Sequence, residues 1–372
     1  MSQAAVRDAP QPIPIALCLS PDAISRFGVI ARHLIVGLID QPFRLLVLSS
    51  DAKATSLSLG PVQVIPHTKI GRLFSRRRFQ RLIESLSPQL PAVIHAMSRE
   101  SYDLAARLVE ALDAELVLQV SSHLDSESVD DFASFPRTTI ITTSQPLTDK
   151  FEPRQTSAPD GLQLIRPGVV AASTPAAFAT PDRDPTAVCT ADLMPDQGVD
   201  RLLQAAALLR NRGLPLLIFL LGTGRWEDEL RVQANRLGLS SSVTFAPSAT
   251  NLSQAFQGAD IFVQPSAATQ FSADSFLAMA QGMAVVACRN PISDHLHHGQ
   301  TAWVCESSTP ECLADGLESI LRDRVLGQTL GAKALEYLRT HHLVSTMVEK
   351  TATLYRRLAL AHATFPMTGP GT

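Results

Sequence analysis

The chain has 372 residues, 45% of them hydrophobic, and a formal net charge of −3 at pH 7. This length and apolar content suffice for two domains with their own cores, and the small net charge gives no general attraction to nucleic acids or anionic membranes. No apolar run approaches the roughly 18 residues of a membrane span, and the early run 13–19 lacks a basic leader. The five scattered cysteines predict neither a disulfide framework nor a metal site, and they favour a reduced, cytoplasmic compartment.

The first half of the chain alternates strand and helix patterns. Residues 1–12 are polar and predict a loose tail, and residues 14–19 predict a strand followed by a loop over 20–26 and a helix to about residue 38. Further strands are expected at 43–49, 62–65, 92–96, 116–120 and 138–143, with a helix at 102–112. This alternation is typical of a parallel sheet covered by helices.

Residues 69–86 predict a basic amphipathic helix. Its apolar stripe is formed by Phe79, Leu82, Ile83 and Leu86. The opposite face carries the cations Lys69, Arg72, Arg76, Arg77, Arg78 and Arg81. Two interpretations stay open for this face. It could contact an anionic membrane surface, chiefly through Arg76, Arg77 and Arg78, or it could be an ordinary solvated helix surface.

The second half repeats the alternation after a stretch rich in Ala, Pro and Thr at 171–185, which predicts an inter-domain linker. Strands are expected at 188–194, 216–221, 243–245, 261–263 and 283–288. Helices are expected at 199–210, 227–237, 252–257, 310–322, 326–341 and 344–360. No internal repeat is present.

The stretch 259–304, which begins ADIFVQPSAATQFSADSFLAMAQGMAVVA, carries the most informative pattern. It resembles the C-terminal signature of GT-B glycosyltransferases, in particular retaining family 4. In that family the loop and helix read approximately P-S-x-x-E-G-F-G-x-x-x-x-E-A-M-A-x-G-x-P-V-V-A. The positions in register here are Pro265, Ser266, Phe271, Ala278, Met279, Ala280, Gly282, Val285, Val286 and Ala287.

The resemblance implies an α/β protein of GT-B fold. Two Rossmann-like domains with parallel sheets would face a cleft, and a C-terminal helix would cross back to the N-terminal domain. The expected parts are a tail at 1–12, an acceptor-side domain at 13–170, a linker at 171–186, a nucleotide-sugar-side domain at 187–342, the returning helix at 343–362 and a tail at 363–372.

The resemblance also assigns a donor site. Residues matching the family's donor-binding positions are Gly28, Gly222, Gly224, Pro265, Ser266, Thr269, Gln270 and Phe271. Gly28 would allow backbone to approach the donor phosphates from the first strand–helix loop, although a plain tight turn explains a single glycine equally well. His123 follows the strand at 116–120, near the place where the family has a His beside the transferred sugar. It is therefore the candidate catalytic residue, with a polar strand-end residue as the alternative.

Four charged positions of the family's donor site are replaced. Asp192 and Gln197 stand where the family has an Arg and a Lys, and Thr269 and Leu277 stand where it has two Glu. A diphosphate needs cations in a dry site, so Asp192 would repel it. The candidate replacement cations are Arg26, Arg166, Arg225 and Arg289.

The expected function is transfer of a sugar from a nucleotide-sugar to an unknown acceptor, such as a glycan, a lipid or a cell-envelope precursor, with retention of configuration. The resemblance implies no cofactor and no metal, and the turn with His295, His297 and His298 has no particular metal geometry. Peripheral contact with the inner face of the membrane is part of this hypothesis. The alternative is an inactive GT-B protein that binds or stabilises a partner.

Overall fold

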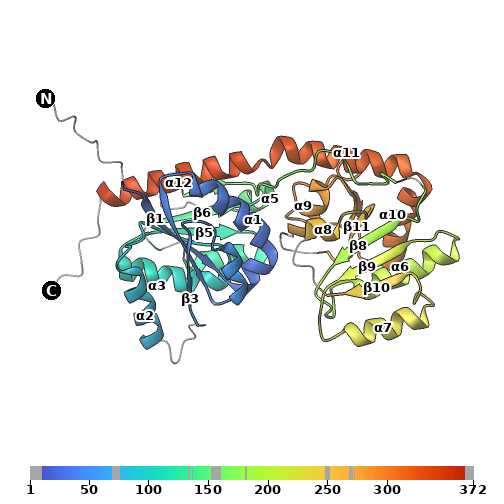
Figure 1. The fold of residues 1–372 in the computed structure, drawn as a ribbon, viewed down its shortest axis with the longest axis horizontal. Helices are drawn as coiled ribbons and strands as arrows, with labels where there is room; N and C mark the ends of the chain where they lie inside the picture. The colour runs from blue at the N-terminus through green and yellow to red at the C-terminus, as the bar shows by residue number, and fades with distance from the viewer. Residues whose placement is uncertain are drawn as a thin grey trace. The chain divides into compact units, whose positions relative to one another are not determined.

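The computed structural model describes residues 11–68, 76–132, 135, 137–151, 161–180, 182–247, 252–267, 271 and 273–364. The chain divides into unit 1, which comprises Met1–Gly168 and Val344–Thr372, and unit 2, which comprises Val169–Leu343. Each unit is built on a parallel sheet with helices packed around it (Figure 1). The prediction of two Rossmann-like halves is confirmed.

Unit 1 contains a seven-stranded sheet in the order β3-β2-β1-β4-β5-β6-β7. Its strands are β1 (Ile13–Leu19), β2 (Phe43–Ser49), β3 (Gln63–Pro66), β4 (Val93–Ala96), β5 (Glu115–Val120), β6 (Thr138–Thr142) and β7 (Leu162–Leu164). Its helices are α1 (Pro21–Ile39), α2 (Arg76–Leu86), α3 (Tyr102–Leu112), α4 (His123–Ser128), α5 (Gln145–Thr148) and α12 (Val344–Thr364). Short 3-10 turns lie at Ala52–Leu57, Arg99–Ser101 and Val129–Asp131.

Unit 2 contains a six-stranded sheet in the order β10-β9-β8-β11-β12-β13. Its strands are β8 (Thr186–Thr190), β9 (Leu217–Leu221), β10 (Val243–Ala246), β11 (Ile261–Gln264), β12 (Ala284–Cys288) and β13 (Trp303–Cys305). Its helices are α6 (Val199–Asn211), α7 (Glu227–Arg236), α8 (Leu252–Ala255), α9 (Ala273–Ala280), α10 (Pro310–Arg322) and α11 (Arg324–His341).

The strand order reverses once in each sheet, between β1 and β4 in unit 1 and between β8 and β11 in unit 2. Because strand–helix–strand crossovers are right-handed, helices that follow strands on either side of the reversal cover opposite faces of the sheet. The loops on the two sides therefore diverge at the carboxyl ends of the central strands. Ligands of open α/β sheets bind at this topological switch point.

The last helix, α12, packs on unit 1, as predicted. It contacts α1 and the central strands β1, β4 and β5. Gly37 of α1 makes this packing close, because a Cβ at that position would lie 2.3 Å from Val348 Cγ2. The terminal segment of the chain thus completes the N-terminal unit.

Helix α1 begins earlier than predicted. Ser20 caps it by accepting a hydrogen bond from the Ala23 backbone N–H at 3.0 Å, and Pro21 occupies the first turn. The predicted loop over 20–26 is wrong because Ser-Pro-Asp at 20–22 is a helix start signal, with a cap, a proline at the first position and an acid in the first turn.

The stretch 171–185, predicted as a linker, packs against unit 2 in its described part. The Asp260 carboxylate accepts hydrogen bonds from the backbone N–H groups of Phe178 and Thr186, both at 2.9 Å, and from Arg183 Nη2 at 2.7 Å. Phe178 is buried in the unit 2 core. A composition rich in Ala and Pro therefore marks an irregular but ordered segment here.

None of the helices in the described ranges combines the length and apolar character required to cross a bilayer.

Candidate functional site

The carboxyl edge of the unit 2 sheet is held together by close backbone contacts at glycines. A Cβ on Gly222 would lie 1.8 Å from the Ala191 carbonyl oxygen, and one on Gly224 would lie 2.1 Å from that of Leu193. Gly198 has a positive φ of 78°, and its Cβ would lie 2.6 Å from the Pro265 carbonyl oxygen. These three glycines bring the loops after β8, β9 and β11 together at the switch point.

Three polar side chains lie at this switch point. Thr190 ends β8, Gln264 ends β11, and Asp274 lies in the first turn of α9. Thr190 Oγ1 donates a hydrogen bond of 2.6 Å to Asp274 Oδ2. The pKa of Asp274 is raised, first by burial and also by the negative charge of Asp192, while the Thr190 hydrogen bond opposes this shift.

Gln264 and Thr190 share one face of the sheet. β11 pairs with β8 with Phe262 opposite Val188, and continuing this register by two residues sets Gln264 beside Thr190. Gln264 is only 8% exposed, yet both its amide oxygen and its amide nitrogen lack a hydrogen-bond partner in the described protein. Sequence reasoning missed these residues because a Gln at the end of an apolar strand carries no motif.

Three of the four positions at which the resemblance implies a replaced charge, Asp192, Gln197 and Leu277, lie in the described part of unit 2. β8 ends at Thr190, earlier than the predicted strand 188–194, so Asp192 lies in the loop that follows, exposed, as does Gln197. Leu277 is 3% exposed and belongs to the buried side of α9. Thr269 and Gln270 lie outside the described residues.

The other positions assigned from the motif have structural roles. Pro265 is buried, and its carbonyl oxygen accepts hydrogen bonds from Ser308 Oγ and from Cys288 Sγ, the latter at 3.2 Å. Ser266 follows it and is partly exposed. Phe271 is buried with its ring centroid 4.9 Å from that of Phe276, which makes it part of an aromatic cluster.

Two of the proposed replacement cations are paired with acids. Arg289 Nε donates to Glu306 Oε2 at 2.6 Å in an exposed, bidentate ion pair, so its charge is largely compensated. Arg26 lies within α1, not in a loop, and its Nε donates to Asp22 Oδ2 at 2.8 Å. Arg166 follows β7 and is partly buried, and Arg225 is exposed just after Gly224.

Arg201, which carries no motif signal in the sequence, is a further cation of unit 2. Arg201 of α6 donates from Nη2 to the Asp196 carbonyl oxygen at 3.5 Å, and its Nε is buried without a partner in the described protein. Burial raises the pKa of the Cys288 thiol, at the end of β12, to about 11. The charge of Arg201 opposes this shift.

Gly28 does not occupy a strand–helix loop. It lies in α1, two turns from the cap, where an added Cβ would meet only Ile24 Cγ2 at 3.9 Å. The expected backbone approach to a phosphate at Gly28 is therefore wrong, because the helix already begins at Pro21.

His123 begins α4, directly after its cap Ser122. Its Nδ1 contacts Lys150 Nζ, and its pKa is lowered, first by burial and then by that ammonium. The turn before it is fixed by Asp125, whose Oδ2 accepts from the Ser121 backbone N–H at 2.9 Å and from Ser121 Oγ at 2.8 Å. His123 is thus held, with a cationic neighbour, at the carboxyl edge of unit 1.

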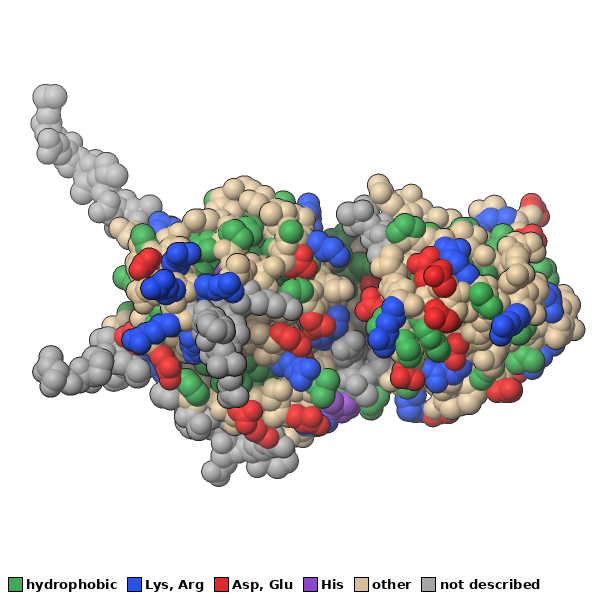
Figure 2. All heavy atoms as spheres, turned by 90° about the horizontal axis from the view of Figure 1, so that it is seen from below, with side chains coloured by type: hydrophobic (Ala, Val, Ile, Leu, Met, Phe, Trp, Pro, Cys, Tyr) green, Lys and Arg blue, Asp and Glu red, His purple; other side chains and the backbone are tan. Residues whose placement is uncertain are grey.

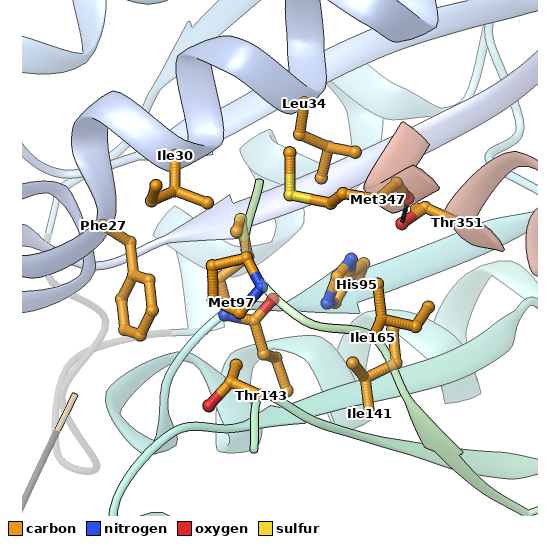
Figure 3. Close-up of a pocket in the computed structure, with 12 residues that line it drawn as sticks. Phe27, Ile30, Leu34, His95, Met97, Ile141, Thr143, Ile165, Met347 and Thr351 are labelled. Atoms are coloured by element: carbon orange, nitrogen blue, oxygen red, sulfur yellow. Dashed lines mark hydrogen bonds between the residues drawn. The ribbon is translucent and has the colours of Figure 1, made fainter. Parts of the chain in front are cut away.

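Unit 1 encloses a small, mainly apolar cavity at its own switch point (Figure 3). Its lining comes from α1, from the ends of β4, β5 and β6, from the segment after β7 and from α12. The lining residues are Phe27, Ile30, Leu34, His95, Met97, Gln119, Ile141, Thr143, Ile165, Pro167, Met347 and Thr351. The Thr143 and Thr351 hydroxyls donate to backbone carbonyls of Val120 and Met347, so their protons are already used.

His95 is the titratable side chain of this cavity. It is 1% exposed, its Nδ1 lies 2.6 Å from the Tyr355 hydroxyl, and its Nε2 has no partner in the described protein. Burial lowers the pKa of His95 to about 3 and raises that of Tyr355, so both groups are neutral at pH 7. The hydrogen bond between the phenol and Nδ1 therefore joins two neutral groups.

The histidine turn of unit 2 is structural. His295 is buried near Ser275, with Nε2 3.3 Å from Ser275 Oγ, and His298 Nδ1 accepts from the Val304 backbone N–H at 3.1 Å. Across the ranges that the structure describes, no three His, Cys, Asp or Glu side chains gather so that they could hold a metal ion.

Residues 184–323 match the family model described as Glycosyl transferases group 1. A GDP-mannose-dependent alpha-(1-6)-phosphatidylinositol monomannoside mannosyltransferase of Mycobacterium tuberculosis is 28% identical over 182 residues, which are 46% of this chain and 47% of that protein. The chain thus spans about half the length of the curated relatives it matches.

Solved structures cover nearly the whole chain. Anabaena Alr3699/HepE in complex with UDP-glucose has a TM-score of 0.76 at 18% identity, covering 93% of this chain and 100% of that one. A sucrose-phosphate synthase of Thermosynechococcus elongatus has a TM-score of 0.74 at 18% identity, covering 94% and 100%. The GT-B fold and the similarity to group 1 glycosyltransferases are confirmed.

Proposed function

We propose that the protein binds a nucleotide-sugar at the carboxyl edge of unit 2 and transfers its sugar, with retention, to an acceptor bound by unit 1. The observation that supports this is that the family match over 184–323 contains the switch point of unit 2, where close contacts at glycines and the polar residues Thr190, Gln264 and Asp274 are found. The mycobacterial relative uses GDP-mannose and the Anabaena protein binds UDP-glucose, so nucleoside diphosphate-sugars are the donors to test. No cofactor is part of the proposal.

The donor diphosphate would be held weakly. Asp192 and Asp274 place carboxyl groups near the expected position of the diphosphate, and the exposed Arg289 is compensated by Glu306. Each charge-assisted hydrogen bond that is lost costs about 1.5–3 kcal/mol. We therefore expect UDP- and GDP-sugars to bind with dissociation constants above about 1 mM.

The test is calorimetric titration of the protein with UDP, GDP and their glucose and mannose conjugates, followed by chromatography of the products. Weak binding with slow release of the free sugar supports a glycosyltransferase with an altered donor site. Absence of binding to every nucleotide and nucleotide-sugar would contradict the proposal.

A second candidate is a non-catalytic GT-B protein that acts as a binding or stabilising subunit. It is favoured by the carboxyl groups of Asp192 and Asp274 and by the absence of a carboxylate at the buried Leu277. Binding of a nucleotide-sugar without any cleavage, with or without acceptor extracts, would favour this candidate over the first.

We also propose that α2 contacts anionic lipid. Arg76, Arg77 and Arg78 are exposed, while Leu82 and Leu86 are buried beneath them. In Figure 2, Lys and Arg side chains gather on the face of unit 1 that carries α2. Each such cation near an anionic surface contributes about 1 kcal/mol.

Cosedimentation with phosphatidylglycerol vesicles at low salt tests this contact. Replacing all three arginines by Glu should abolish cosedimentation, whereas the same change at the exposed cations Arg236, Arg322 and Lys333 of unit 2 should not. A wild-type protein that stays in the supernatant would leave only a solvated helix face.

A further inference from the structure

The buried amide of Gln264 has no structural explanation within the protein. Both of its polar atoms are shielded from solvent and unpaired in the described residues, although native proteins pair almost all such groups. An unpaired buried amide destabilises the fold unless a ligand supplies its partners. Gln264 also stands at the switch point, where a ligand is expected.

Gln264 has a small side chain beside it on one neighbouring strand and a hydroxyl that binds a carboxyl group beside it on the other. Ala287 of β12 is its partner in the sheet and has the smallest side chain that carries a Cβ. Thr190 follows on the other side, at the spacing of adjacent strands, about 4.8 Å. Because Thr190 donates to Asp274, the carboxyl group of Asp274 lies within reach of the same ligand as the Gln264 amide.

The two side chains define the chemistry of that ligand. The amide offers one acceptor and two donor hydrogens, and the carboxyl oxygens of Asp274 accept. Asp192 adds further negative charge close by, which disfavours a phosphate. A pair of vicinal hydroxyls, each able to donate and to accept, is complementary to this set.

Asp274 also explains how the site could work without a carboxylate at Leu277. The two residues are three positions apart on α9 and therefore lie on neighbouring turns of one helix side. Leu277 is committed to the core, so a carboxyl group can reach the carboxyl edge of the sheet only from the first turn.

We infer that Gln264 and Asp274 together bind a vicinal hydroxyl pair of the ligand, either on the ribose or on the sugar of the nucleotide-sugar. The inference rests on the proposed function for the identity of the ligand. It makes Gln264 a specificity-determining residue of unit 2.

The test uses the full-length protein and the variants Gln264→Met and Asp274→Asn. Met keeps the length of the side chain and removes the amide, while Gln257→Met at an exposed position of unit 2 is the matched control. Calorimetry with UDP-glucose and GDP-mannose should show about tenfold weaker binding by both site variants and no change in the control. The thermal midpoint of Gln264→Met should stay the same or rise, since an unpaired polar group has been removed.

A second measurement separates the inference from the proposed function. The side-chain amide signal of Gln264, identified by its loss in Gln264→Met, is followed by NMR with uridine, guanosine, glucose and mannose at millimolar concentration. If nucleosides shift the signal, the hydroxyl pair that Gln264 binds belongs to the ribose. If free sugars shift it, the pair belongs to the transferred sugar.

The outcomes are distinct. Nucleotide-sugar binding that is unchanged in both variants overturns the inference and leaves the proposed function standing. A Gln264 signal that responds to free sugars or nucleosides, in a protein that binds no nucleotide-sugar, supports the inference and overturns the proposed function. A signal that responds to none of these ligands overturns the inference, and only a lack of nucleotide-sugar binding in calorimetry overturns the proposed function. A lower thermal midpoint with unchanged affinity assigns Gln264 a structural role only.

Discussion

The two units share one topology and differ in the side chains that meet where the strand order reverses. In unit 1 the edge between β1 and β4 encloses an apolar cavity with the neutral, buried His95. In unit 2 the edge between β8 and β11 carries Thr190, Gln264 and Asp274 and is flanked by the exposed Asp192. The backbone thus forms a switch point in each sheet. The side chains make the switch point of unit 1 apolar and that of unit 2 polar.

The largest expected effect is a loss of folding stability at acid pH, which arises from the buried His95. Its folded-state pKa of about 3 lies below its unfolded value of about 6.5, so the folded protein resists protonation. The stability associated with the neutral His95 is complete above the unfolded pKa and is lost as pH falls through it toward the folded pKa. Between pH 7 and pH 4 the free energy of unfolding of unit 1 should fall by about 3 kcal/mol from this group.

Hydrogen exchange of β4 peptides across this pH range measures the loss. The variant His95→Gln, which keeps an acceptor for Tyr355, should flatten the pH dependence, and His67→Gln at a partly exposed position of unit 1 should leave it unchanged. Equal pH slopes in wild type and His95→Gln would show that the edge of unit 1 is wetter than the cavity lining indicates.

The next effect concerns the hydrogen bond between His95 and α12. Tyr355→Phe removes the phenol that is hydrogen-bonded to His95 Nδ1 and leaves a buried ring nitrogen without a partner. This should cost about 1–3 kcal/mol, measured as a lower urea midpoint for protection of β4 and α12 in hydrogen exchange. No change in midpoint would mean that packing alone, including the Gly37–Val348 contact, fixes α12 on unit 1.

A smaller effect is expected when the unit 2 edge is made basic. Asp192→Arg with Gln197→Lys changes two exposed side chains to the cations that the resemblance implies at these positions, while the buried Leu277 stays as it is. UDP and GDP should bind about tenfold more tightly, or about 1.4 kcal/mol, by calorimetry. The control Asp228→Arg with Gln257→Lys adds the same charge elsewhere on unit 2. An equal gain in nucleotide affinity in this control would show that net charge alone causes the effect.

The smallest effect is expected at the exposed pair Arg289–Glu306. Glu306→Gln should leave the thermal midpoint unchanged, because exposed ion pairs contribute little to stability. It also frees Arg289, and a modest gain in UDP affinity would show that this arginine reaches the ligand. An unchanged affinity would remove Arg289 from the candidate cations.

Most of the element order followed from the sequence. The helices at 102–112 and 310–322 were predicted with their observed bounds, because each has a clear apolar periodicity and defined ends. The strand at 188–194 ended earlier than predicted, and β13 at Trp303–Cys305 was not predicted at all. Strands of three to five residues, such as β13 and β8, are too short for periodicity to locate their ends.

The site was predicted less well than the fold. Resemblance located the edge at Pro265 and the glycines Gly222 and Gly224, whose close contacts require residues without a Cβ. It also placed Gly28 in a loop, because the helix start at Ser20 was overlooked. At positions that differ from the family pattern, the resemblance indicated which side chains are missing. It did not indicate which other residues of this chain occupy the site.

The sequence by itself determined the alternation of strands and helices and the two-unit architecture. Only the tertiary structure showed that Thr190 is hydrogen-bonded to Asp274, that Gln264 is buried and unpaired within the described residues, that Arg289 is paired, and that His95 is buried against Tyr355. Periodicity is a local property that neighbouring residues fix. The partner, the burial and therefore the pKa of a polar side chain depend on residues distant in the sequence, which only the folded chain brings within hydrogen-bond distance.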